Sequence, residues 1–180
     1  MRTALYRILT AMALVAIGGA AHAQGTYKTN SFSVDFNGPV QTKAYRNDAN
    51  TSTRTAYSSC SGDICEGVTV VAIDHDIDVN MASAEFYRNS ASDNEFQSHT
   101  DVNSEGYYQG HPYAYGNYTS TINGVEYEWF ERFIVVNSRE VVFIYMSIPS
   151  SDYESGKVGK SGGGSTYAAW QTFEYTLNLF

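Results

Sequence analysis

Two turn signals in the second half of the chain separate three runs of residues that favour β-strands. Asn123-Gly124 lies between runs rich in Tyr, Thr, Val and Phe, and this dipeptide suits the positive φ angles of a tight hairpin turn. Asn137-Ser138-Arg139 is a second turn signal, which precedes the run at 141–148. The pattern predicts a three-strand antiparallel meander within residues 106–149. Because the last run is apolar at almost every position, we expect its strand to be central and covered on both faces.

The start of the chain is typical of a secretory signal peptide. Arg2 and Arg7 provide a positive charge, residues 8–17 form an apolar segment, and Ala21-His22-Ala23 is an A-x-A cleavage site. The apolar segment is shorter than the ~20 residues that a membrane-spanning helix needs. We therefore expect cleavage near Ala23, a periplasmic or secreted location, and one domain over residues 24–180 without a transmembrane segment.

The charge of the chain restricts the partners that it could bind. Loss of Arg2 and Arg7 with the signal peptide would take the formal net charge from −8 to −10. A strongly acidic protein is repelled by nucleic acids and by anionic membranes, so neither is expected as a partner. We expect a monomer.

Cys60 and Cys65 are the two cysteines of the chain. In an oxidising compartment, an even pair at this spacing predicts a disulfide, and Ser61-Gly62-Asp63 between them favours a hairpin turn. The closed loop is short, so the bond should contribute roughly 2 kcal/mol. A redox site is a weaker alternative, because the spacing is not C-x-x-C and no neighbouring base would lower a thiol pKa. Zinc would need more ligands.

The first half of the chain predicts four further strands before the meander. The clearest is 32–36, in which Phe32, Val34 and Phe36 alternate with polar residues. The expected strands are 32–36, 40–47, 51–60 and 66–78.

Two helices are expected. The first covers 81–88 and is capped by Asn80. The polar stretch 89–100 after it is expected to be irregular. The second covers about 166–175, docks Trp170 and Phe173 on the sheet, and is followed by a short extended tail, although the alternation near the end also suits a strand.

The segment after the fourth strand resembles a calcium-binding loop. Carboxylates stand at loop positions one, three, five and twelve, supplied by Asp74, Asp76, Asp78 and Glu85. Hard oxygen ligands at this spacing could surround Ca²⁺. Against this interpretation, Val79 stands where the loop needs glycine for a sharp turn, and a strand precedes it instead of a helix. The alternative is a strand end with solvated acids, followed by a helix N-terminus.

An aromatic cluster in the meander is a second candidate site, for a sugar or for an interface. Its main members are Tyr108, Tyr113, Tyr115 and Trp129. Exposed rings could stack on a ligand or anchor a partner. At strand spacing, however, cross-strand packing explains most of the cluster.

No catalytic set is evident in the sequence. The histidines after residue 23 are His75, His99 and His111. No nucleophile elbow and no H-E-x-x-H motif occurs. The paired acids Glu126 and Glu128 share one strand face and Glu131 points to the other. Paired carboxylates could transfer protons, but a charged outer face is the ordinary explanation.

Two short motifs resemble those of exported bacterial PsbP-like domains. Phe32-Ser33-Val34-Asp35-Phe36-Asn37-Gly38 is similar to their F-x-V-x-F-P-G start, with Asn37 in place of proline, and Gly110-His111-Pro112-Tyr113 resembles their G-x-P strand entry. The order of meander, loop and terminal helix is also similar. The resemblance implies an α+β fold, an α/β/α sandwich with a central antiparallel sheet of six to seven strands and helices on its faces. Related proteins, such as the photosystem subunit PsbP and the Ran-binding factor Mog, are binding or assembly proteins.

These observations favour an exported, non-enzymatic binding or accessory domain whose partner is an envelope protein or a small ligand, with no cofactor. Two alternatives are a calcium-binding exported module that uses the Asp74–Glu85 loop, and an enzyme of unknown type. Fold resemblance by itself is a weak argument for function.

Overall fold

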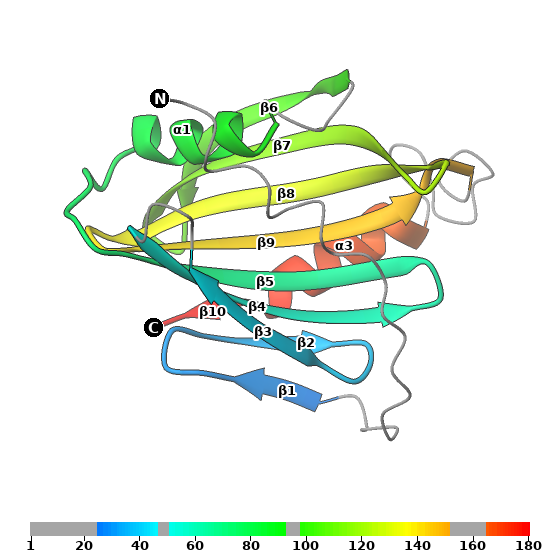
Figure 1. Cartoon of the computed structure of the whole chain (residues 1–180), viewed down its shortest axis with the longest axis horizontal. Coiled ribbons are helices and arrows are strands. Elements are labelled where there is room, and N and C mark those ends of the chain that lie inside the picture. The colour runs from blue at the N-terminus through cyan, green and yellow to red at the C-terminus, as the bar shows by residue number, and fades with distance from the viewer. Residues whose placement is uncertain (1–24, 47–50, 93–97, 152–164) are drawn as a thin grey trace.

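A strongly bent antiparallel sheet of seven strands forms the body of the protein (Figure 1). The structure is a computed structural model, and it describes residues 25–46, 51–92, 98–151 and 165–180. In sheet order its strands are β3 (Gln41–Arg46), β4 (Ser52–Ser61), β5 (Ile64–Ile73), β9 (Glu140–Pro149), β8 (Val125–Asn137), β7 (His111–Ile122) and β6 (Ser98–Tyr108). A smaller antiparallel sheet contains β1 (Gly25–Lys28), β2 (Phe32–Phe36) and β10 (Asn178–Leu179). Two helices lie within the described ranges over their full length, α1 (Met81–Ser92) and α3 (Ser165–Thr176).

The predicted meander is confirmed as β7, β8 and β9. Asn123 and Gly124 have φ angles of 52° and 82°, as expected of the two central residues of a type I′ turn, and Ile122 pairs with Val125 across it. β9 lies between β5 and β8 in the sheet, and its residues from Val141 onward are buried. The near-continuous apolar run was therefore a correct signal of a strand covered on both faces.

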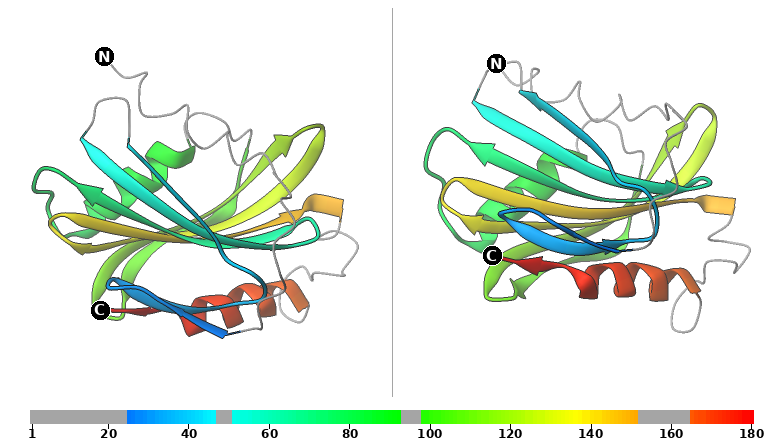
Figure 2. Two further views of the ribbon diagram at one scale, coloured as in Figure 1. Left: turned by 60° about the horizontal axis from the view of Figure 1, so that its bottom comes forward. Right: turned by 90° about the horizontal axis from the view of Figure 1, so that it is seen from below.

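The two faces of the large sheet bury separate cores. One core lies between the sheet, β2 and α3, and includes Phe32, Phe130 and Trp170. The other lies between the sheet and α1, and includes Ala84 and Phe133. Figure 2 shows α1 on one side of the bent sheet, and α3 with the smaller sheet on the opposite side.

The predicted α/β/α sandwich is wrong, because a second sheet covers one face of the large sheet together with α3, and α1 is the only described helix on the other face. The fold is mostly β: strands make up well over half of the described residues, helices make up less than a fifth, and the strands form two antiparallel sheets. The difference arises at β2, which is not part of the large sheet. It pairs instead with β1 and β10, over the same face as α3. The alternation of Phe32, Val34 and Phe36 indicates one buried face, but it does not say which sheet the strand joins.

Most of the other element predictions are confirmed. Strands β3, β4 and β5 match the expected runs, except that β5 ends at Ile73. Asn80 caps α1, because its Oδ1 accepts a 2.9 Å hydrogen bond from the Ser83 amide. α3 and the short β10 match the predicted helix and tail. The prediction of an irregular stretch at 89–100 is wrong in part, because α1 continues to Ser92 and β6 begins at Ser98.

The disulfide is present, between directly paired residues of a hairpin. Cys60 and Cys65 face each other on β4 and β5 with 4.1 Å between their Cα atoms. The predicted signal peptide, 1–23, lies outside the described residues. None of the described helices is long and apolar enough to cross a membrane.

Candidate functional site

The loop that joins β5 to α1 is held against the turn between β8 and β9. The Ile73 amide donates to the Arg139 carbonyl at 2.8 Å, and the Ile77 amide donates to the Ser138 carbonyl at 2.9 Å. These two bonds fix the ends of the segment between them. The loop therefore has a defined shape although its side chains are mostly exposed.

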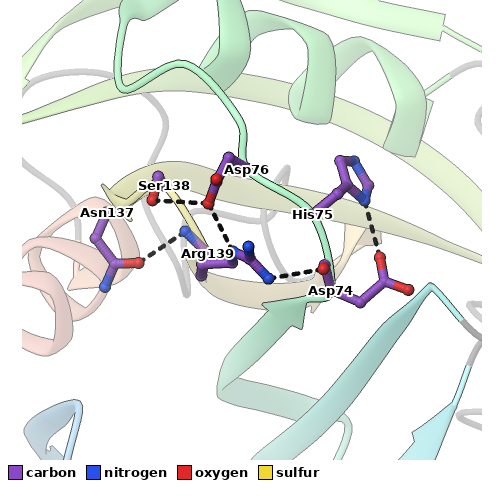
Figure 3. A network of polar contacts seen from close by, with 6 residues as sticks. All are labelled: Asp74, His75, Asp76, Asn137, Ser138 and Arg139. Atoms are coloured by element: carbon purple, nitrogen blue, oxygen red, sulfur yellow. Dashed lines mark hydrogen bonds and ion pairs between the residues drawn. The ribbon is translucent and has the colours of Figure 1, made fainter.

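Arg139 connects the acidic side of this loop to the β8–β9 turn (Figure 3). Its Nε donates to Asp76 Oδ1 at 2.6 Å and its Nη1 donates to the Asp74 carbonyl at 2.7 Å. The hydrogen bond from Arg139 is the main reason that the pKa of Asp76 is lowered. Both side chains are more than half exposed, so the pair positions the loop but adds little to global stability.

Three large apolar side chains are exposed on α1 and on the loop that leads into it. Ala84 faces the sheet and is fully buried, whereas Phe86, two residues further on, is 61% exposed. Val79 and Met81 are 49% and 38% exposed. These three make up nearly half of the seven large hydrophobic side chains that are exposed in the described part of the chain, and they fall within eight residues.

An open hollow lies between the loop and the helix. Its volume is about 260 Å³. Its wall is both apolar and polar, and includes His75, Ile77, Asp78, Ser83, Phe86 and Tyr87. The Phe86 and Tyr87 rings meet edge to face, with their centroids 5.5 Å apart. We call the hollow together with the exposed side chains of Val79, Met81 and Phe86 the α1 patch.

The four predicted calcium ligands lie on this loop and helix, but they are not gathered around one point. The Asp76 carboxylate binds Arg139, and Glu85 pairs with Arg88 at 3.3 Å on the same helix. Asp74 Oδ1 contacts His75 Nδ1 at 2.9 Å. Within the described ranges, no three His, Cys, Asp or Glu residues are grouped so that they could hold a metal ion. The arrangement therefore gives no support to a calcium site.

Calcium is expected to leave the thermal unfolding temperature unchanged. The guanidinium of Arg139 already pairs with the Asp76 carboxylate. A cation at the loop would therefore have to break that pair and draw the other acids together. The expectation is measured by thermal unfolding in about 5 mM calcium and in chelator. This calcium concentration exceeds the dissociation constants of sensor-type calcium sites. A rise of several degrees that Asp76→Ala removes would contradict the expectation.

The structure separates the predicted aromatic site into two parts. Tyr108, Tyr113 and Tyr115 surround the guanidinium of Arg132, whose Cζ lies 4.8, 4.4 and 5.9 Å from the three ring centroids. Trp129 lies on the opposite face of the sheet, where it stacks on Tyr118. Tyr115 and Trp129 are each only 8% exposed, so they cannot serve as an open stacking surface.

Arg132 and its three tyrosines fasten the C-terminal part of the chain to the large sheet. Arg132 forms an ion pair with Glu174 of α3, and the Tyr108 hydroxyl donates to the Glu174 carbonyl at 2.7 Å. Burial raises the pKa of Glu174, and the neighbouring Arg132 lowers it. Burial also raises the pKa of Tyr108 to about 12. We interpret this group as structural, because its members contact one another.

Glu131 is the titratable residue whose environment differs most from the one expected from the sequence. It lies on β8 between Trp129 and Phe133 on the α1 side of the sheet, and it is 1% exposed. Burial raises its pKa to about 7, and the neighbouring Tyr118 hydroxyl acts in the opposite direction. The explanation by a charged outer face is therefore wrong for Glu131. Its large apolar neighbours two positions away on either side were the available signal.

Glu66 is a second buried carboxyl, and it holds the backbone in place at Asn37. It accepts hydrogen bonds from the amide and from the side-chain Nδ2 of Asn37, the latter at 2.8 Å. Desolvation raises its pKa, although these two bonds act in the opposite direction. Asn37 thus ties the end of β2 to β5.

Comparisons with known proteins name no family for this chain. No protein-family model matches it, and no curated protein matches its sequence significantly. Among solved structures, it is similar to a protein of unknown function, PA94 from Pseudomonas aeruginosa, with a TM-score of 0.45 and 11% identity over 72% of this chain and 91% of that chain. This likeness is too weak to support an argument about fold or function. The resemblance to PsbP-like domains stays a prediction.

Proposed function

We propose that the protein is an exported, non-catalytic binding protein, and that the α1 patch is where a protein partner docks. The observation that carries the proposal is the exposure of Val79, Met81 and Phe86 within one short segment, of which Phe86 and several of the intervening residues line an open hollow. Large exposed apolar groups that gather in one place commonly mark an interaction site. The N-terminal pattern of the sequence and the Cys60–Cys65 disulfide support export.

The shape of the hollow favours a protein partner over a small ligand. Small-molecule pockets usually enclose about 300–1,000 Å³ and bury most of the ligand. This hollow holds about 260 Å³ and is open to solvent. It could receive one large side chain, while Phe86 and Met81 pack against the surrounding surface of the partner.

A photoreactive phenylalanine analogue placed at position 86 tests this docking surface. The matched control carries the same analogue at Tyr175, which is 79% exposed on α3, on the other side of the sheet. After irradiation in an envelope extract of the producing cells, we expect one discrete adduct from position 86 and none from position 175. The adduct should disappear when Val79 and Met81 are both replaced by serine. Equal labelling from both positions, or none from position 86, would refute the proposal.

A further inference from the structure

Two exposed acids without a lysine or arginine partner in the described part of the chain lie at the α1 patch, and this bears on the chemistry of the partner. Asp74 and Asp78 are exposed, and within the described ranges neither forms an ion pair with lysine or arginine. Asp76 is also exposed and Glu85 is partly exposed, but each has an arginine partner. A surplus of negative charge thus remains at the rim of an apolar surface.

Two of the polar residues stand at the hollow itself. Asp78 and His75 belong to its wall together with Ile77 and Phe86. An apolar side chain in the hollow would therefore lie within reach of the Asp78 carboxylate. Asp74 is four residues away along the same exposed loop, where its side chain contacts His75.

A second copy of this chain does not fit the surface. A symmetric dimer would place each α1 patch against the same patch of the other copy. Asp74 and Asp78 of the two copies would then approach each other, in a chain whose formal net charge is −8. Like charges brought together in this way oppose association.

We infer that the α1 patch recognises a cationic, apolar segment of another protein: a large hydrophobic side chain flanked by lysine or arginine. This inference rests on the proposed function and specifies the class of its partner. The hydrophobic side chain enters the hollow against Ile77 and Phe86. The flanking cations pair with Asp78 and Asp74, because Asp76 is already engaged by Arg139.

A set of three synthetic peptides tests the inference directly. The first carries one phenylalanine and one leucine among lysines and glycines, the second replaces each lysine by glutamate, and the third replaces both apolar residues by serine. Each is titrated into isotope-labelled protein and followed by NMR. Only the first should bind, and its shift changes should centre on residues 74–88. Binding of the glutamate peptide with equal affinity, or shift changes centred elsewhere, would overturn the inference.

Variants that remove charge test the role of the two acids. Asp74→Asn with Asp78→Asn should weaken binding of the lysine peptide about tenfold at low salt, since exposed ion pairs are individually weak and two of them are lost together. Binding by the wild-type protein should fall steeply in high salt. The control is Asp35→Asn with Glu126→Gln, two exposed acids on β2 and β8, which changes net charge equally and should leave binding unchanged.

The two proposals fail in distinguishable ways. If the photoadduct from position 86 forms but is insensitive to salt and to the Asp74→Asn, Asp78→Asn substitutions, the docking surface stands and the cationic partner is wrong. If no adduct forms and no peptide binds, the docking surface itself is wrong.

Discussion

Replacement of Trp170 by alanine is expected to lower the free energy of unfolding by about 3–5 kcal/mol, in the range found for large-to-small substitutions in protein cores. Trp170 is 1% exposed and is the largest fully buried side chain. Its ring lies 6.2 Å from Phe130 and 6.3 Å from Tyr115, measured between centroids, and so joins α3 to β8 and β7. Its loss would leave a cavity between the helix and the sheet. Denaturant unfolding followed by circular dichroism measures the change.

Tyr175→Ala is the matched control for this substitution. Tyr175 is on the same helix, but its side chain is 79% exposed. Its removal should change the free energy of unfolding by no more than about 0.5 kcal/mol, as for ordinary surface substitutions. Similar losses from the two variants would mean that α3 does not contribute its inner face to the core as described.

Replacement of Glu131 by glutamine should remove a pH dependence of stability. Burial raises the pKa of Glu131 from 4.5 to about 7. Between these two values the folded state keeps a proton that the unfolded state has lost, so stability falls as pH rises from about 4.5 to about 7 and then levels off. With about 1.4 kcal/mol for each pKa unit, the loss amounts to about 3 kcal/mol. Glutamine carries no charge at any pH, and Glu131→Gln should therefore be the more stable protein at pH 8.

The measurement is the free energy of unfolding of both proteins at several values between pH 4 and pH 8. The two curves should converge near pH 4 and separate as pH rises. Glu126→Gln, at the exposed start of the same strand, is the control and should follow the wild-type curve. Parallel curves for Glu131→Gln and the wild-type protein would show that the buried carboxyl does not titrate in this range.

The candidate surface was only partly visible in the sequence. The sequence indicates the loop acids and the helix start at Asn80, and it offers calcium binding as one interpretation of the acids. It places Arg139 only in a turn, because the contact of Arg139 with Asp76 spans 63 positions of the chain. The exposure of Phe86 had a local signal, because the inward stripe of α1 runs through Ala84 and Arg88 and Phe86 lies between them.

The sequence by itself determined the local features of this protein. Asn123-Gly124 and the alternation around it defined a hairpin, Asn80 defined the start of α1, and the spacing of Cys60 and Cys65 defined a disulfide. Each depends on the φ angles, hydrogen bonds and reach of residues close together in the chain. Such preferences act before any distant contact is made.

Only the tertiary structure decided which faces and strands come together. It placed β2 in a second sheet, and it put Trp129 on the opposite face from Tyr108, Tyr113 and Tyr115. It also buried Glu131 and placed Arg139 where it pairs with Asp76. The physical reason is that apolar alternation specifies one buried face for each strand, whereas the partner of that face is selected by packing between segments that are distant in sequence.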